Sequence, residues 1–170
     1  RADPDFVEMP LARMTSDLYA AERASTIRMD RATPSTEVEP GLGPAFSEGE
    51  NTTHYSIVDA QGMAVSVTTT INSWYGSKVT VAGAGFVLNN EMDDFAAKPG
   101  TPNQFGLVQG ENNAVAPGKR MLSAMTPSIV LDPSGELLMV TGTPGGSTII
   151  TTVFQTISNV VDYGMNVVQA

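Results

Sequence analysis

The sequence contains no cysteine and a single histidine, His54. The lack of cysteine excludes disulfides, thiolate metal sites and a cysteine nucleophile. One histidine is too few for the usual multi-histidine zinc or iron centre, and we expect neither a metal nor a cofactor. Basic residues are also scarce: nine lysines and arginines face eighteen acidic residues, for a formal net charge of −9. Such a charge repels phosphate backbones, so we expect no nucleic-acid partner.

Long hydrophobic runs are missing as well. Runs such as residues 137–140 are far shorter than the roughly 20 apolar residues that cross a bilayer, so we expect no membrane span in this segment. The 170 residues nevertheless include 41% hydrophobic residues, together with 16 glycines and 11 prolines. This composition indicates a globular, turn-rich chain.

The first 51 residues are polar and interrupted by proline. A helix is predicted from Ser16 to about Asp30, with Asp17 in its first turn, where a negative charge suits the helix dipole. Residues 32–50 combine prolines, glycines and acidic side chains without periodicity, which predicts an exposed linker.

From Thr52 onward, small and β-branched residues dominate. Strands at 52–59 and 63–72 are predicted to flank a turn at 60–62, a register that places Thr52 opposite Thr70. The other expected elements are a strand at 83–90, a mainly loop segment at 92–114, a hairpin of 128–131 with 136–141, and a helix at 148–163. This pattern predicts an α+β fold, with an antiparallel sheet covered by helices.

A threonine at the start of the first hairpin is the candidate nucleophile. His54 points away from Thr53 and lies a full strand repeat from Thr52, so it is poorly placed as a base and is expected to be a half-buried strand residue. The α-amine of Thr52, with a pKa near about 8, could act instead if the Asn51–Thr52 bond were cut. Thr70 could then orient the hydroxyl. The alternative is that these threonines only favour β structure.

Two further segments suggest binding groups. Gly145 and Gly146 lie between a predicted strand and a predicted helix, where backbone N–H groups can hold a developing oxyanion, although a tight turn would need the same residues. The polar cluster at 89–95 could bind a substrate ammonium group, cap a turn or bind calcium, but it lacks the EF-hand spacing.

Four motifs, in this order, resemble those of the γ-glutamyltransferase (γ-glutamyltranspeptidase) family: TTHYS at 52–56, LNNEMDDF at 88–95, KRMLSAMTP at 119–127 and TGTPGGS at 141–147. The resemblance covers essentially the whole chain and implies the αββα sandwich of the N-terminal nucleophile hydrolases. It identifies residues 1–51 with the end of the large subunit, and residues 52–170 with most of the small subunit. It also implies that an inactive precursor cuts itself at Asn51–Thr52.

The resemblance implies γ-glutamyl transfer or hydrolysis of glutathione-type amides, with amino acids or peptides as acceptors. Thr52 would be the nucleophile, and Thr70 would hydrogen-bond to it. The remaining roles fall to residues that hold the donor's α-amino end (Asn72, Glu91 and Asp94), its α-carboxylate (Ser123) and the oxyanion (Gly145 and Gly146). A periplasmic or extracellular location is implied as well.

The sequence departs from the family pattern at one position, and one residue that the family uses lies outside this segment. Ala124 stands where the family commonly has a second serine, so a related acylase similar to the cephalosporin acylases is an alternative function. The family's arginine for the α-carboxylate belongs to the rest of the large subunit. This segment alone is therefore expected to be inactive, and a non-catalytic relative is the third possibility.

Overall fold

A computed structural model describes residues 2–34 and 51–170, which form two compact units. The first unit contains the described residues 2–34 and 94–122, and the second contains 51–93 and 123–170. The predicted linker at 32–50 lies almost entirely outside the described residues. The division predicted at Asn51–Thr52 concerns a processing site and stays a prediction.

The first unit begins with two short helices, α1 (Leu11–Met14) and α2 (Asp17–Ala24). Ser16 caps α2 as the sequence predicts, its Oγ accepting a hydrogen bond from the Tyr19 N–H at 3.2 Å. The predicted end near Asp30 is wrong, because the helix stops at Ala24. The hydroxyls of Ser25 and Thr26 bind carbonyls three residues back and so compete with the helical pattern. None of the α2 residues is buried, so no packing extends the helix.

The rest of the first unit is mainly loop, as predicted for residues 92–114. It contains the short 3-10 helix η3 (Glu111–Asn113), and a parallel bridge joins Ala96 to Ala114. Phe95 and Ala96 are its buried apolar residues, and Asp3 and Asn113 are buried polar ones. The buried residues described in this unit are therefore polar as well as apolar.

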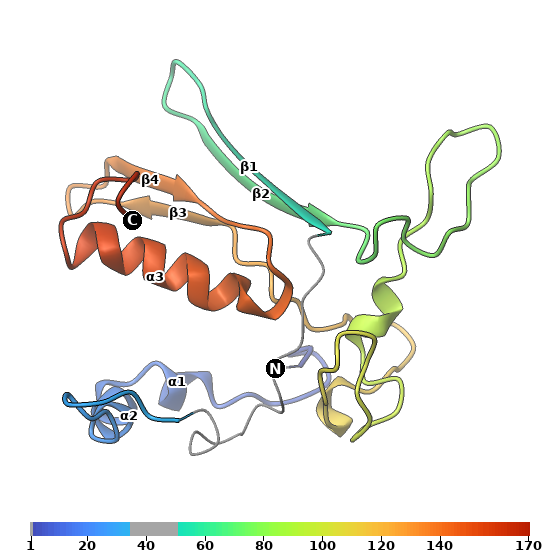
Figure 1. The fold of residues 1–170 in the computed structure, drawn as a ribbon, viewed down its shortest axis with the longest axis horizontal. Helices are drawn as coiled ribbons and strands as arrows, with labels where there is room; N and C mark the ends of the chain where they lie inside the picture. The colour runs from blue at the N-terminus through green and yellow to red at the C-terminus, as the bar shows by residue number, and fades with distance from the viewer. Residues whose placement is uncertain (1, 35–50) are drawn as a thin grey trace. The chain divides into compact units, whose positions relative to one another are not determined.

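The second unit is built from two antiparallel hairpins (Figure 1). Strand β1 (Thr52–Val58) pairs with β2 (Ala64–Thr70), and the predicted pairing of Thr52 with Thr70 is confirmed. The Asp59 carboxylate fixes the turn by accepting hydrogen bonds from the N–H groups of Gln61 and Met63, at 2.9 and 2.8 Å.

The second hairpin pairs β3 (Ser128–Leu131) with β4 (Leu137–Thr141), also as predicted. The Asp132 carboxylate accepts hydrogen bonds from the Ser134 hydroxyl and from the backbone of Ser134 and Glu136. These bonds, the one from the Ser134 hydroxyl above all, lower the pKa of Asp132.

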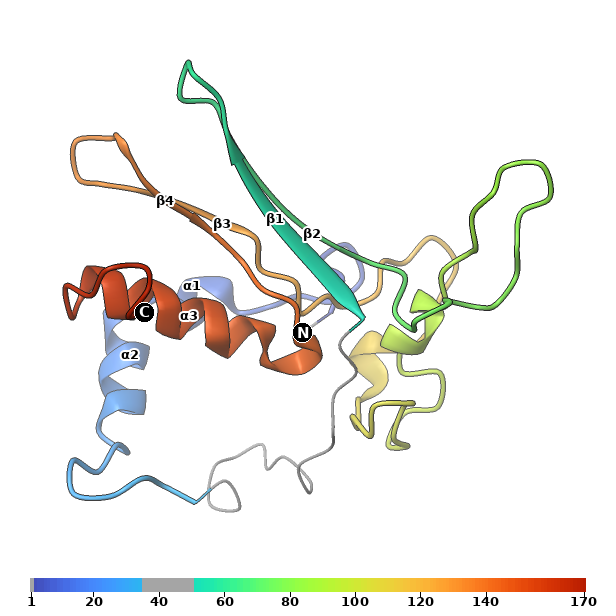
Figure 2. The same ribbon diagram turned by 45° about the horizontal axis from the view of Figure 1, so that its top comes forward.

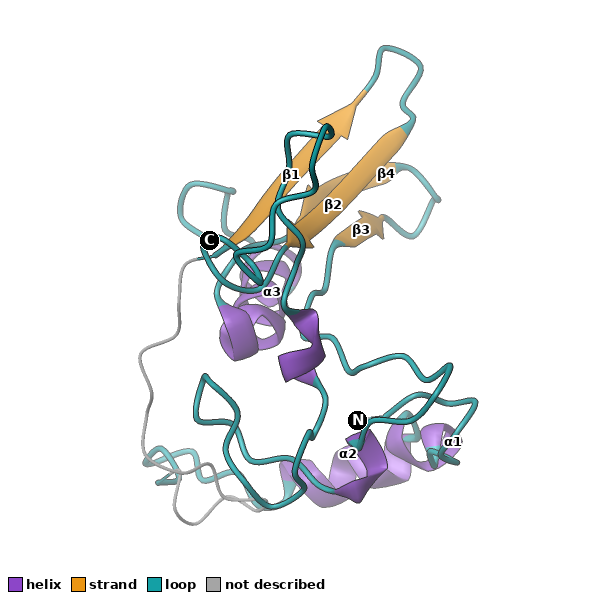
Figure 3. Cartoon of the chain, turned by 90° about the vertical axis from the view of Figure 1, so that its right-hand side faces the viewer, coloured by secondary structure: helices purple, strands orange, loops and turns teal. Residues whose placement is uncertain are grey.

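The two hairpins touch, and a helix runs beside them. Ser66 Oγ on β2 donates to the Thr141 carbonyl on β4 at 3.0 Å. Helix α3 (Ile149–Val161) runs alongside the β3–β4 hairpin and buries Ile149 and Val153 (Figure 2). The strands of the described residues, orange in Figure 3, all fall within the segments of this unit. The α+β class with antiparallel sheets is thus confirmed.

The strand predicted at 83–90 does not form. Between residues 79 and 93, all of them described, the structure has a single bridge from Thr80 to Val87. Gly83 and Gly85 adopt positive φ angles of 79° and 74°, which turn the backbone out of an extended conformation. Across the described ranges, no helix combines the length and the apolar character needed to cross a membrane.

Candidate active site

Thr52 opens β1, and the bond before it is held by a short chain of hydrogen bonds. The Thr70 hydroxyl donates to the Asn51 carbonyl oxygen at 2.9 Å, and the Asn72 N–H donates to the Thr70 hydroxyl oxygen at 2.9 Å. In this uncut chain Thr70 therefore binds the carbonyl that precedes Thr52. The chain of donors polarises the peptide carbonyl of Asn51–Thr52.

The side chain of Asn51 lies in an unfavourable environment. Its Oδ1 is buried and accepts no hydrogen bond from any residue that the structure describes. A buried acceptor without a partner costs about 1–3 kcal/mol. The Asn51 side chain, next to the bond that is predicted to break, thus has an acceptor without a partner among the described residues.

Asn72 connects the end of β2 to the polar cluster. It is buried and adopts a φ of 73°, a left-handed conformation that asparagine tolerates better than most residues. Its Nδ2 donates to the Asn90 carbonyl at 3.1 Å. Asn90 in turn binds the Ser73 backbone N–H and hydroxyl through its side chain. The structure therefore places Glu91, the next residue, close to Asn72.

Asn90 lies in the polar cluster singled out at 89–95, but no individual role was predicted for it. The tandem Asn89-Asn90 was the available clue, since the Asn89 side chain accepts a hydrogen bond from the Glu91 N–H at 3.0 Å. That bond fixes the start of the 3-10 helix η2 (Glu91–Asp94). Both asparagines thus shape the segment that carries Glu91 and Asp94.

His54 is held on both sides of its ring. Its Nδ1 lies 2.9 Å from Thr68 Oγ1, and its Nε2 lies 3.0 Å from Ser56 Oγ. The ring also packs so tightly on Gly142 that a Cβ at that position would overlap it. This confirms the prediction of a half-buried structural histidine.

The glycine pair lies where the chain passes from β4 to α3. Gly145 and Gly146 have φ angles of 134° and 55°, and the 3-10 helix η4 (Gly146–Thr148) leads directly into α3. The Thr148 hydroxyl donates to the Gly145 carbonyl at 2.7 Å and steadies the turn. The predicted strand–glycine–helix arrangement is therefore present.

The structure brings Thr52 and this turn to the same end of the second unit. The three views agree that β1 starts close to the end of α3 where the helix begins (Figures 1–3). His54, on the same face of β1 as Thr52, contacts Gly142, three residues before Gly145. A hydroxyl at the start of β1 and backbone N–H groups at the start of α3 are thus placed in one region.

Asp94 and Ser123 are the residues at which the chain passes, along its sequence, from one unit to the other. Asp94 is the first residue of the second segment of the first unit, and its carbonyl accepts a hydrogen bond from Asn113 Nδ2 at 2.7 Å. The Ser123 hydroxyl oxygen accepts one from the Met125 N–H at 3.1 Å. The residue before it, Leu122, donates its N–H to Asn113 Oδ1 at 3.1 Å. No sequence motif contains Asn113, so its role was not predicted.

An ion pair in the first unit was missed as well. Both oxygens of the buried Asp3 carboxylate bind Arg120, one accepting from Nη2 at 2.6 Å and the other from the backbone N–H at 2.7 Å. These bonds with Arg120 hold the pKa of Asp3 well below its usual range. Asp3 and Arg120 are 117 residues apart, so sequence spacing gave no indication of the contact.

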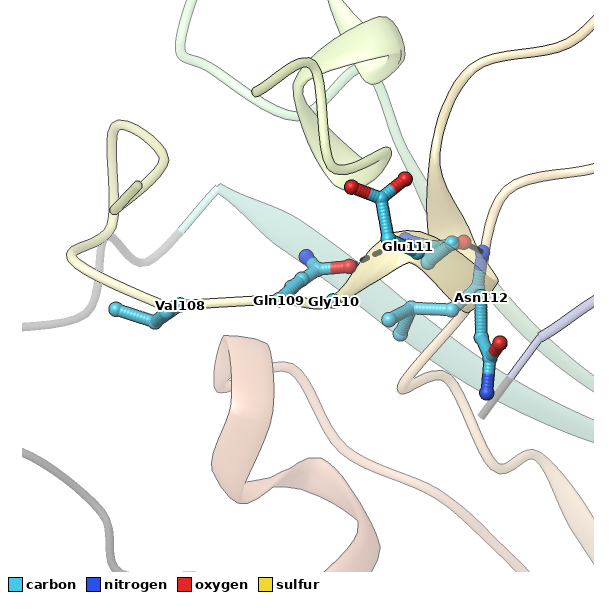
Figure 4. Close-up of a pocket in the computed structure, with 7 residues that line it drawn as sticks. Val108, Gln109, Gly110, Glu111 and Asn112 are labelled. Carbon is cyan, nitrogen blue, oxygen red and sulfur yellow. Dashed lines mark hydrogen bonds between the residues drawn. The ribbon is translucent and has the colours of Figure 1, made fainter. Parts of the chain in front are cut away.

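A pocket of about 470 Å³ also belongs to the first unit (Figure 4). It is lined by residues 108–113 and Leu122, and thus by neither Thr52 nor the glycine pair. Within the described ranges, no group of three or more histidine, aspartate or glutamate side chains is placed to hold a metal ion.

The fold and the site define an α+β protein in which a threonine at a strand start lies near a glycine turn that begins a helix. A family model described as Gamma-glutamyltranspeptidase matches residues 1–170. The chain belongs to the gamma-glutamyltranspeptidase family.

Individual relatives agree with this assignment. The chain is 54% identical over 168 residues to a glutathione hydrolase proenzyme of Pseudomonas sp. (strain A14), and 51% identical over 168 residues to that of Escherichia coli (strain K12). In both cases the match covers 99% of this chain and 29% of the relative, so the chain spans less than a third of their length. A solved gamma-glutamyltranspeptidase from Pseudomonas nitroreducens, complexed with L-DON, is 56% identical with a TM-score of 0.64, covering 68% of this chain and 59% of that one.

Proposed function

We propose that the full-length protein is a precursor that cuts itself at Asn51–Thr52 and then uses Thr52 to transfer or hydrolyse the γ-glutamyl group of glutathione-type amides. The observation that carries this proposal is the hydrogen bond from the Thr70 hydroxyl to the Asn51 carbonyl. A donor aimed at the carbonyl of a peptide bond is what an attack on that carbonyl requires.

The cut is an intramolecular acyl shift. Thr52 Oγ attacks the Asn51 carbonyl carbon, a C–O bond forms, and the C–N bond breaks as the nitrogen takes a proton, which leaves an ester. That step frees the Thr52 α-amine, and water then hydrolyses the ester, which gives the Asn51 carboxylate and restores the Thr52 hydroxyl. Thr70, backed by the Asn72 N–H, stabilises the oxyanion of the first step. Cleavage also releases Asn51, whose buried Oδ1 lacks a partner among the described residues.

The new α-amine supplies the base for turnover. It takes the Thr52 hydroxyl proton as the oxygen attacks the γ-amide carbonyl, and the N–H groups of Gly145 and Gly146 hold the oxyanion. Collapse releases the amine and leaves a γ-glutamyl ester on Thr52. Water, or the amine of an amino acid or peptide, then attacks this ester and takes the γ-glutamyl group from Thr52.

The donor's charged head determines which amides react. Asn72, Glu91 and Asp94 hold its α-amino group, with Asp94 supplying the principal charge, and Ser123 contacts its α-carboxylate. The names of the relatives as glutathione hydrolase proenzymes support both the substrate class and the precursor.

The proposal includes the finer fold and the subunit division. The two hairpins and α3 form part of the αββα sandwich of N-terminal nucleophile hydrolases, which the likeness to solved family members supports. Residues 1–51 are the end of the large subunit, and residues 52–170 are most of the small one. The remainder of the large subunit is the obligatory partner.

The test compares the full-length wild type with Thr52→Ala and Thr52→Ser. Intact mass is expected to show one cut, between Asn51 and Thr52, in the wild type and in Thr52→Ser, and none in Thr52→Ala. The cut protein should hydrolyse γ-glutamyl-p-nitroanilide. Cleavage of Thr52→Ala at the same bond would refute the role of Thr52, and a cut protein active only on other side-chain amides would indicate an acylase instead.

A further inference from the structure

Asn113 is a buried amide of the first unit. It is only 2% exposed and ends the 3-10 helix η3. Its Nδ2 donates to the Asp94 carbonyl at 2.7 Å and to Gln109 Oε1, and its Oδ1 accepts the Leu122 N–H at 3.1 Å. Both amide hydrogens are thus engaged. The Gln109 side chain is turned toward η3 (Figure 4).

The main chain of Asn113 strengthens the same connection. Its carbonyl accepts the Ala96 N–H at 2.9 Å, and a parallel bridge joins Ala96 to Ala114. Residues 94–96 are therefore held to η3 by side-chain and backbone bonds together. Leu122 is held to the opposite end of the same side chain.

The two segments that Asn113 joins carry the proposed recognition groups for the two charged ends of the donor. One segment contains Asp94, proposed for the α-amino group, and the other continues directly into Ser123, proposed for the α-carboxylate. In a γ-glutamyl donor these two groups are bonded to one carbon, so the residues that bind them must keep a fixed spacing.

No other side chain of similar size supplies the same bonds. The amide gives two donors and one acceptor to two carbonyl-type oxygens and one N–H. A carboxylate at this position keeps the acceptor but places negative oxygens against the Asp94 carbonyl and Gln109 Oε1. An alanine leaves all three partners buried without their bonds.

We propose that Asn113 is a positioning residue that fixes the spacing between Asp94 and Ser123, and so sets the preference for donors that carry both an α-amino group and an α-carboxylate. This inference rests on the proposed function of those two residues. The hydrogen bonds of Asn113 lie within the first unit, whereas Thr52, Thr70 and the glycine pair belong to the second. Its loss therefore weakens donor recognition more than self-cleavage.

The experiment uses full-length Asn113→Asp, with Asn112→Asp as its matched control. The neighbouring Asn112 is exposed, so the same change of charge is made one residue away without disturbing the buried bonds. Self-cleavage is followed by denaturing electrophoresis. The kcat and KM are measured for γ-glutamyl-p-nitroanilide and for glutaryl-p-nitroanilide, which lacks the α-amino group.

For Asn113→Asp we expect normal cleavage, a rise in KM for the γ-glutamyl donor of about 10- to 100-fold, and a much smaller change for the glutaryl analogue. The preference between the two donors should thus shrink, while Asn112→Asp keeps the wild-type preference. An equal loss for both donors, or equal behaviour of the two variants, overturns the inference.

A milder variant covers the case in which Asn113→Asp does not fold. Gln109→Ala removes one partner of Asn113 and leaves its bonds to Asp94 and Leu122. It is expected to shrink the preference in the same direction by a smaller factor, and an unchanged preference overturns the inference. A wild-type protein that is not cut, or not active on either donor, refutes the proposed function itself and is thereby distinguished from failure of the inference alone.

Discussion

The contact of His54 with Gly142 gives a quantitative prediction for Gly142→Ala. A methyl group at Gly142 would overlap the imidazole ring, whose two nitrogens are held by Thr68 and Ser56. Overpacking costs about 1–3 kcal/mol, and two weakened hydrogen bonds add about 0.5–1.5 kcal/mol each. We therefore expect Gly142→Ala to lower the free energy of unfolding by about 2–6 kcal/mol.

The assay is urea unfolding of the full-length Thr52→Ala precursor background, which is expected to keep the chain uncut. Gly110→Ala is the matched control, since a Cβ there meets no atom within 4 Å and the residue has an ordinary negative φ. The free energy of unfolding of Gly110→Ala should stay within about 0.5 kcal/mol of that of the Thr52→Ala parent.

A double-mutant cycle identifies the cause. If the ring is the obstacle, His54→Ala should remove most of the cost of Gly142→Ala, because the two residues are in contact. Full additivity of the two changes, or a stability of Gly142→Ala equal to that of Gly110→Ala, would refute the steric reasoning.

Two further changes test other parts of the molecule. Gly145→Ala places a side chain at a φ of 134°, which disturbs the turn that carries the oxyanion donors. We expect the kcat of the cleaved variant on γ-glutamyl-p-nitroanilide to fall by on the order of 10²-fold. An unchanged kcat, calculated per molecule of cleaved protein, would contradict a role of Gly145 in oxyanion binding. Asp3→Asn should destabilise the protein near neutral pH, because the depressed pKa of Asp3 means that its charged form stabilises the fold above the unfolded-state pKa of about 4. In unfolding experiments, the difference in free energy of unfolding between the wild type and Asp3→Asn should shrink as the pH falls below about 4. A difference that does not depend on pH would contradict the role of the ion pair.

Local patterns in the sequence predicted the second unit well. The turn residues Asp59 and Asp132 hold their hairpins through bonds to residues two and four positions along, so alternation and turn chemistry were enough to give the register of Thr52 with Thr70. The apolar face of α3 and the glycine turn before it are equally local features. The structural character of His54 also followed from strand geometry.

Where the sequence failed, local preference was overridden or did not apply. The helix was predicted to continue to about Asp30, but none of the α2 residues is buried, and hydroxyls beyond Ala24 take the carbonyls. The β-like residues around 83–90 form a single bridge, because two glycines with positive φ interrupt them.

The sequence by itself determined the family, the candidate nucleophile and the two hairpins, because these depend on neighbouring residues and on motifs that can be read in order. Only the tertiary structure decided that Thr70 binds the Asn51 carbonyl, that Asp3 pairs with Arg120, and that Asn113 joins Asp94 to Leu122. Those bonds join backbone and side-chain groups from segments that are distant in the sequence. Only the folded path of the chain brings such groups within hydrogen-bonding distance, and no periodic pattern in the sequence indicates which groups will meet.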